Sequence, residues 1–132
     1  MNNIDDIAEL AVKYKHEGKN CAQAVLLALK DKTNLSEDEL LKLGSGFGVG
    51  FGSMEATCGA LIAANMILGF NRDSKPKTMF ESKEMLNDFK ELSGASICKD
   101  LKGIETGVVL CPCDDCVRNA IRVLLKRLNN NQ

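Results

Sequence analysis

The sequence predicts an all-α protein, a compact bundle of about five or six helices in which residues 1–132 form a single cysteine-rich domain. Apolar residues recur at helical spacing along most of the chain. Capping residues precede several of these segments. A length of 132 residues and an apolar fraction of 45% suffice for one core, and because only 5% of the residues are aromatic, we expect that core to be aliphatic.

Three helices are predicted in the N-terminal part of the chain. The first covers about residues 4–14 and ends before Gly18. The second covers residues 21–30 and follows Asn20, a residue type that favours the N-cap position. The third follows Ser36, which begins a capping box with the glutamate three residues later. These signals place the first cysteine of the chain at the start of a helix.

Glycine alternates with larger residues between Gly44 and Gly52, and we expect a glycine-rich loop here. Each glycine costs about 1 kcal/mol inside a helix, whereas positive φ angles and close backbone approaches favour it. No strand precedes the run and no Gly-Lys-Ser/Thr is present, which excludes dinucleotide-binding and P-loop motifs. We predict that bare backbone crowds around a cofactor site, and a flexible connection between helices is the alternative. The candidate cofactor-binding glycines are Gly46, Gly48, Gly50 and Gly59.

The next two helices are predicted from their caps and stops. Ser53 is expected to cap a helix that contains Cys58 in its early turns and ends at about residue 68, before Gly69. Ser74 precedes a helix over residues 75–92, whose early proline suits a first turn. The residues of this helix that we expect to face inward are Met79, Phe80, Met85, Leu86 and Phe89.

The C-terminal part of the chain predicts a short turn, a loop and one long helix. Ser96 is expected to cap a turn that contains Cys98, and residues 103–111 are expected to form a connecting loop. The final helix covers about residues 114–128, where apolar residues again recur at helical spacing.

The charge pattern excludes several classes of partner. The formal net charge is −1 and the basic residues are spread along the chain, which argues against nucleic-acid binding. No run of about 18 apolar residues predicts a membrane span, and the acidic start lacks the pattern of a secretory signal. We therefore expect a cytoplasmic protein with a redox partner of unknown identity, and a homodimer is an arrangement that the sequence leaves open.

Six cysteines are the unusual feature of the composition. In a reducing compartment, and in a chain long enough to build a core, clustered cysteines indicate metal binding or redox chemistry more than disulfides. Each of them falls near a predicted helix N-terminus, where free N–H groups and the helix dipole stabilise a thiolate. A single cysteine in a helix is often a small buried hydrophobic residue, but six together favour a shared site. The candidate metal ligands are Cys21, Cys58, Cys98, Cys111, Cys113 and Cys116.

The densest group of cysteines is the segment Cys111-Pro-Cys113-Asp-Asp-Cys116. The spacing of Cys113 and Cys116 suits two ligands of one metal or a catalytic redox pair. No second pair with this spacing exists, so the pattern is not that of a zinc ribbon or a bacterial ferredoxin. No strand–helix context predicts a thioredoxin fold either. A site must therefore be assembled by tertiary folding from distant cysteines.

Three functions agree with these observations. The first is an electron-transfer protein in which Cys21, Cys58, Cys98 and Cys113 converge on an iron–sulfur cluster, since soft thiolates favour iron–sulfur clusters or zinc. The second is a metal-free thiol–disulfide protein that uses Cys113 and Cys116. The third is a non-enzymatic interaction module stabilised by zinc. The only histidine, His16, lies in a polar stretch and is expected to be a surface residue.

Five pieces of the chain form an ordered set of motifs: Asn20 to Val25, Ser45 to Gly50, Cys58 to Ala60, Cys98 to Gly103, and Cys113 or Cys116 with Val117 to Ala120. Their order resembles that of the C_GCAxxG_C_C family of redox-active proteins, over about residues 20–128. The resemblance implies a helical domain with a redox role, and a related domain accompanies haem segments in split-Soret cytochromes, where an iron–sulfur site has been proposed. The chain has no Cys-x-x-Cys-His, so covalent haem is not implied. The chain departs from the family motif at two points: it has Ala63 where the motif has a glycine, and it has three cysteines at the C-terminal motif, any of which could fill the family position.

Overall fold

The computed structural model describes residues 3–130 of the chain. This part of the chain is helical and contains no strand, only one isolated bridge between two residues, which confirms the predicted all-α class. It has seven α-helices, more than the five or six expected, because the turn at Cys98 forms a helix of its own. The helices are α1 (Ile4–His16), α2 (Cys21–Ala28), α3 (Glu37–Gly44), α4 (Gly59–Phe70), α5 (Lys75–Ser93), α6 (Cys98–Lys102) and α7 (Cys113–Asn130), with short turns η1 (Lys30–Lys32) and η2 (Gly50–Met54).

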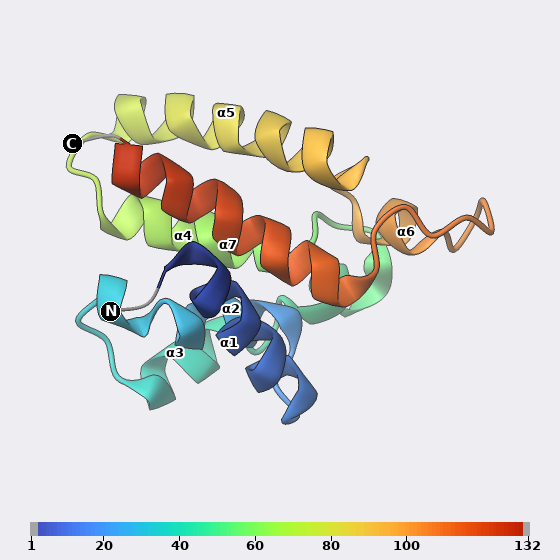
Figure 1. Ribbon diagram of the computed structural model, residues 1–132, viewed down its shortest axis with the longest axis horizontal. Coiled ribbons are helices and arrows are strands. Elements are labelled where there is room, and N and C mark those ends of the chain that lie inside the picture. The colour runs from blue at the N-terminus through green and yellow to red at the C-terminus, as the bar shows by residue number, and fades with distance from the viewer. Residues whose placement is uncertain (1–2, 131–132) are drawn as a thin grey trace.

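The C-terminal helix α7 is the centre of the arrangement. It packs against α1, α4 and α5, and α2 packs against α1, α3 and α4. Figure 1 shows α4, α5 and α7 running along the long axis of the molecule, with α1 to α3 below them and α6 at one end. Among the described residues, the buried core is mainly aliphatic, and Phe89 is its one fully buried aromatic side chain. The largest fully buried side chains include Leu26, Ile67, Ile121 and Leu124.

Side-chain caps determine where several helices begin, as the sequence predicts. The Asn20 side chain accepts a hydrogen bond from the Gln23 N–H (2.8 Å), and the Gln23 side chain accepts one from the Asn20 N–H (3.0 Å). Ser36 forms the expected capping box at the start of α3, and Ser74 accepts from the Lys77 N–H at the start of α5. Such a cap contributes about 1 kcal/mol. Cys21 is consequently the first residue of α2.

The segment between α3 and α4 differs from the prediction. Gly44 belongs to α3, residues 50–54 form the turn η2, and α4 begins only at Gly59, so the expected plain loop is not what the structure shows. Ser53 does not cap α4, because its hydroxyl donates to the Gly50 carbonyl (3.1 Å) within η2. Gly69 does not end α4 either, since the helix continues to Phe70.

The inward face of α5 is narrower than predicted. Met85 and Phe89 are buried, but Met79 and Phe80 are 63% and 62% exposed. The buried stripe has a four-residue spacing and begins at a charged residue, Glu81, whose carboxylate binds the Arg72 guanidinium. A buried glutamate has no apolar signature, so periodicity alone placed the inward face incorrectly.

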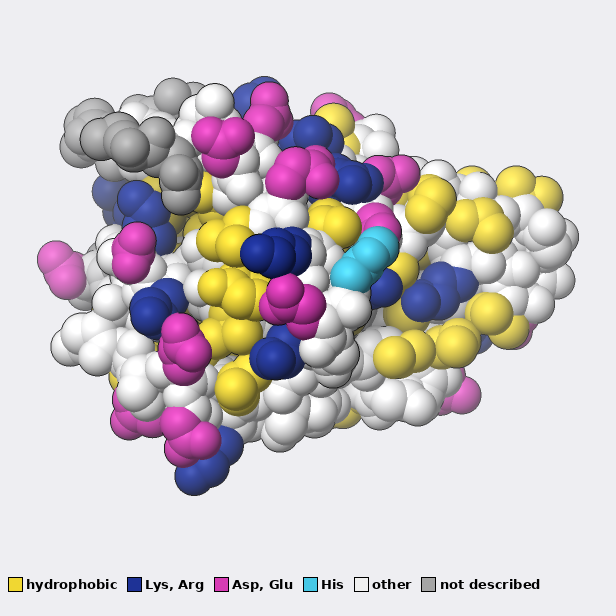
Figure 2. All heavy atoms as spheres, turned by 60° about the horizontal axis from the view of Figure 1, so that its bottom comes forward, with side chains coloured by type: hydrophobic (Ala, Val, Ile, Leu, Met, Phe, Trp, Pro, Cys, Tyr) yellow, Lys and Arg dark blue, Asp and Glu magenta, His cyan; other side chains and the backbone are white. Residues whose placement is uncertain are grey.

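The surface offers no strongly one-signed region on the face that Figure 2 shows, where basic and acidic side chains are intermingled around a central apolar area. His16, the cyan side chain in that view, is 61% exposed and contacts Asp114 (2.7 Å). No helix within residues 3–130 offers a stretch both long and apolar enough to span a lipid bilayer.

Candidate functional site

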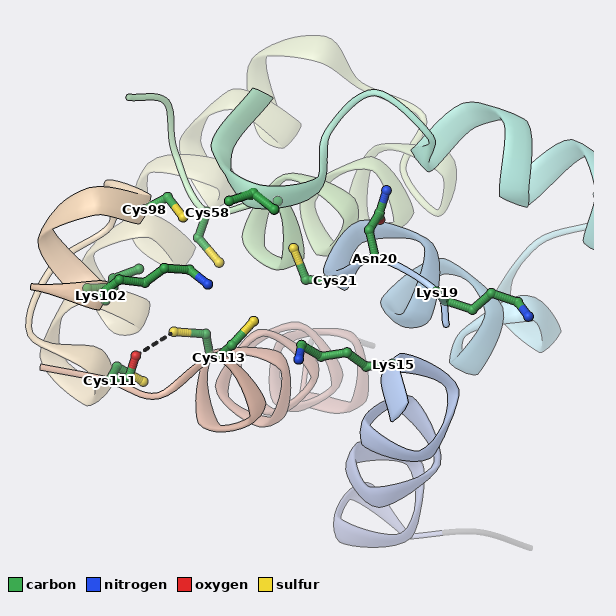
Figure 3. Close-up of a pocket in the computed structure, with 13 residues that line it drawn as sticks. Lys15, Lys19, Asn20, Cys21, Cys58, Cys98, Lys102, Cys111 and Cys113 are labelled. Atoms are coloured by element: carbon green, nitrogen blue, oxygen red, sulfur yellow. Dashed lines mark hydrogen bonds between the residues drawn. The ribbon is translucent and has the colours of Figure 1, made fainter. Parts of the chain in front are cut away.

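All six cysteines line one pocket of about 250 Å³ at the end of the bundle where α6 lies. They come from the starts of α2, α4, α6 and α7 and from the loop that precedes α7. Five are buried and Cys113 is partly exposed, and none forms a disulfide. Figure 3 shows Cys21, Cys58 and Cys98 on one side of the pocket and Cys111 and Cys113 on the other. Residues distant in the sequence thus share one cavity.

Four of these cysteines occupy the first residue or the N-cap of a helix. Cys21, Cys98 and Cys113 are the first residues of α2, α6 and α7, and Cys58 is the N-cap of α4. The first N–H groups of a helix have no partner within it, and the helix dipole is positive at this end. Four helix N-termini therefore surround the pocket, and each of them favours negative charge on its sulfur.

Two backbone hydrogen bonds hold Cys58 beside Cys98. The Cys58 N–H donates to the Ser96 carbonyl (2.8 Å), and the Cys98 N–H donates to the Ala56 carbonyl (2.9 Å). This small antiparallel bridge ties the start of α4 to the start of α6. Ser96 thus contributes its backbone rather than the predicted side-chain cap, and the N-cap of α6 is Ile97. An isolated bridge of this kind is too short to produce the alternation of apolar and polar residues by which a sequence reveals a strand.

A left-handed turn crosses the pocket wall between α3 and α4. Residues 49–52 all have positive φ angles, including 53° at Val49 and 64° at Phe51. A β-branched residue in this region is a strained outlier. Val49 lines the pocket, and its backbone N–H is one of the groups that stabilise the Cys21 thiolate. The strain is thus located at the sulfur site.

The candidate glycines differ in what surrounds them. A Cβ on Gly48 would lie 2.6 Å from the Asn20 Cβ, and one on Gly50 would lie 2.7 Å from the Cys98 Cβ. A Cβ on Gly59 would collide with the Phe47 carbonyl and approach the Cys21 sulfur (3.0 Å). These three glycines allow backbone to pack directly against the elements that carry the cysteines. Gly46 has open space instead, so the structure supplies no such reason for it.

The first pair of interacting sulfurs is Cys21 and Cys113. The Cys113 thiol, as a hydrogen-bond donor, lowers the pKa of Cys21 to about 7 in spite of burial, and the Val49 N–H lowers it further. The same interaction, together with burial, raises the pKa of Cys113. The pair therefore consists of a ready thiolate on α2 and a proton-holding thiol on α7.

The second pair is Cys58 and Cys116. The Cys116 thiol lowers the pKa of Cys58, burial opposes this, and the N–H groups of Leu61 and Ala60 lower it further without forming a regular capping bond. The interaction with Cys58 and burial raise the pKa of Cys116. The sequence predicted a pair of Cys113 with Cys116, but each of these α7 thiols interacts with a cysteine of another helix.

Cys98 and Cys111 complete the pocket in different ways. Burial raises the pKa of Cys98, and the charge of Lys102 opposes this effect. The Cys111 sulfur accepts a hydrogen bond from the Asn119 side-chain amide (3.8 Å). The backbone carbonyl of Cys111 accepts one from the Cys116 thiol (3.5 Å, dashed in Figure 3). Within residues 3–130, no group of three or more Cys, His, Asp or Glu side chains is arranged to hold a metal ion.

Three lysines, and no Asp or Glu, are among the described residues that line the pocket. Lys15 and Lys102 extend into it from opposite sides, whereas Lys19 points away (Figure 3). Lys15 also contacts the Asp114 carboxylate (3.4 Å). Residue spacing did not single out these lysines, because they lie on different elements and lysine is common on helix surfaces, although Lys102 lies within the family-matching piece Cys98 to Gly103.

Comparison with known proteins identifies the family. Residues 19–127 match the family model described as "Putative redox-active protein (C_GCAxxG_C_C)". No curated protein and no solved structure matches the chain. The matched range contains all six cysteines of the pocket. The chain therefore belongs to the C_GCAxxG_C_C family of redox-active proteins.

Proposed function

We propose that the protein transfers electrons by means of an iron–sulfur cluster bound to Cys21, Cys58, Cys98 and Cys113. The observation that supports this proposal is the convergence of these cysteines, each at a helix N-terminus, on one pocket. Amide N–H groups near cluster sulfurs are known to influence reduction potential. The two remaining cysteines, Cys111 and Cys116, would supplement this set.

The donor set of the pocket fits a thiolate-bound cluster better than a single ion. A zinc ion needs its sulfur ligands about 2.3 Å away around one point. The described cysteines instead stand around a cavity of about 250 Å³, and no three of them form a ready metal site. A cluster distributes its ligands over several iron atoms, which suits cysteines that line a cavity of this volume. When bound, such a group supplies one-electron redox chemistry.

The residues of the chain have definite tasks in this proposal. The bridge between residues 56–58 and 96–98 holds two ligands in register. The Val49 N–H and the first N–H groups of α4 stabilise negative charge on sulfur. Burial of the cysteines limits access of water, and the bare backbone at Gly59 allows α4 to approach Cys21.

Anaerobic reconstitution with iron and sulfide tests the proposal. We expect broad visible absorption, with bound iron and acid-labile sulfide, in the wild-type protein. Cys98→Ser should lose most of the bound iron, because Cys98 is one of the four ligands but belongs to neither sulfur pair. Cys116→Ser is the matched variant and should retain it. A colourless protein with stoichiometric zinc would contradict the cluster, and equal iron in wild type and Cys98→Ser would contradict the proposed set of four ligands.

A second candidate is metal-free thiol–disulfide exchange, which the two sulfur pairs favour. In this reaction the Cys21 thiolate attacks a partner disulfide, forms a mixed disulfide and releases one partner thiolate. Cys113 then gives its proton to the released partner thiolate and attacks the Cys21 sulfur, which releases the second partner thiolate. The protein is oxidised to a Cys21–Cys113 disulfide and the partner is reduced by two electrons.

Disulfide mapping separates this candidate from the cluster. If exchange is the function, mild oxidation of the metal-free protein should produce a Cys21–Cys113 or Cys58–Cys116 disulfide, and reduction should reverse it. Cys98→Ser should then leave the reaction intact. Random pairing among the six cysteines, measured by peptide mass spectrometry, would argue against this reaction.

A further inference from the structure

We propose that Lys102, assisted by Lys15, makes the thiol pocket selective for small anionic sulfur compounds, such as carboxylate-bearing thiols or their disulfides, over neutral ones. This inference rests on the second candidate function, metal-free thiol–disulfide exchange, and adds the class of small molecule that reaches the sulfurs.

The charges that face the pocket are unbalanced. Its described lining contains three lysines and no carboxylate, although the whole chain has a formal net charge of −1. The carboxylate of Asp114, the residue after Cys113, is not part of this lining and pairs with Lys15 and His16. Lys102 forms no ion pair with a carboxylate within residues 3–130, so the groups that share its positive charge are the cysteines of the pocket.

The position of Lys102 directs this charge at the sulfurs. Its side chain extends from the end of α6 into the cavity, between Cys58 and Cys98 on one side and Cys111 and Cys113 on the other (Figure 3). Its charge acts on both Cys98 and Cys113. Lys15 enters from the opposite side, beside Cys113. An anion that approaches the thiolates therefore passes between two ammonium groups.

The size of the cavity limits what can enter. Its volume of about 250 Å³ lies below the usual range for drug-sized ligands, so the occupant is small. Cys113 is a partly exposed residue and provides a point of access, whereas the other five cysteines are buried. A compound of a few heavy atoms, with a sulfur at one end and a carboxylate at the other, matches both the thiols and the lysines.

Competing alkylation of the reduced, metal-free full chain tests the inference. Iodoacetate and iodoacetamide have nearly the same size, and each forms an S–CH₂ bond with a thiolate and expels iodide. Both reagents require the same thiolate, so the fraction of thiolate cancels when the iodoacetate rate is divided by the iodoacetamide rate. This rate ratio, divided by the same ratio for a small thiol in solution, reports the electrostatic potential at the cysteine. Peptide mapping assigns the label to each cysteine, and circular dichroism verifies that each variant is folded.

We expect Lys102→Gln to lower this rate ratio about three- to tenfold, the effect of one ammonium several ångströms away in a partly screened site. Lys102→Arg should keep the wild-type ratio. Lys99→Gln is the matched control, because Lys99 lies on the same short helix but pairs with Glu105 (3.5 Å), and its ratio should not change. Lys15→Gln should lower the ratio by a smaller factor, since Asp114 partly neutralises Lys15.

An unchanged ratio in Lys102→Gln would overturn the inference. So would native thiols that resist both reagents but react in denaturant, because small molecules then do not reach the pocket. Since the protein is metal-free in this experiment, the result is independent of cluster binding. A protein that binds no iron but shows the expected ratios would refute the cluster and leave the anion selectivity standing.

Discussion

Two buried polar clusters in this protein are built on opposite plans. On the α5 side of the bundle, the Arg72 guanidinium contacts both carboxylate oxygens of Glu81, at 2.6 and 3.0 Å, and the two side chains are only 10% and 4% exposed. Around the thiol pocket, cysteines with altered pKa values face open volume. The first cluster leaves no room and stabilises the fold, whereas the second leaves space for an occupant.

Removing one partner of the buried ion pair should have the largest effect on stability. We expect Glu81→Ala to lower the free energy of unfolding by about 3 kcal/mol, because Arg72 is then left buried without a counter-charge. Urea denaturation measures the change. Glu84→Ala is the control, since its pair with Arg127 is 43% exposed at the glutamate and should contribute less than about 1 kcal/mol. If the two variants lost the same free energy of unfolding, the Arg72–Glu81 pair would stabilise the fold no more than an exposed ion pair does.

Filling the bare backbone beside the pocket should come next. Gly59→Ala should cost about 2 kcal/mol in unfolding free energy, because the new Cβ collides with the Phe47 carbonyl. It should also reduce iron binding, since it displaces α4 from Cys21. Gly46→Ala, with open space around it, should change neither quantity. Normal iron binding in folded Gly59→Ala would show that the close approach serves the fold alone.

The pairing of Cys21 with Cys113 predicts a pH profile. The pKa of Cys21 is lowered to about 7, so its thiolate forms as the pH rises through 7 and is lost below it. Labelling of Cys21 by iodoacetamide should follow this titration. Cys113→Ala removes the hydrogen-bond donor, raises the pKa of Cys21 and should slow labelling at pH 7 about tenfold, equivalent to about 1.4 kcal/mol. An unchanged pH midpoint of Cys21 labelling in Cys113→Ala would show that Cys113 does not lower the pKa of Cys21.

The smallest expected effect concerns the left-handed turn. Val49→Gly should raise the free energy of unfolding by less than about 1 kcal/mol, because relief of the strained φ angle exceeds the entropy that glycine loses on folding. The backbone N–H that faces Cys21 is retained, so the labelling midpoint of Cys21 should stay near pH 7. A loss of stability greater than 1 kcal/mol would mean that the Val49 side chain matters more for packing than its strain costs.

Local signals predicted most of the helices correctly. The caps at Asn20, Ser36 and Ser74 act within four residues of chain, so the sequence contains all that they need. Predictions became inaccurate where contacts are not local. Ser53 resembles a cap but is used within η2, and the buried face of α5 includes Glu81 because Arg72 lies opposite.

The sequence by itself determined the all-α class and the location of cysteines near helix starts, since helical periodicity and capping are properties of neighbouring residues. Only the tertiary structure decided that the six cysteines share one pocket, that Cys113 pairs with Cys21 rather than with Cys116, and that Lys102 extends among them. The physical reason is that these relations depend on the packing of α2, α4, α6 and α7 against one another. Such contacts join residues that are remote along the chain and leave no periodic pattern in it.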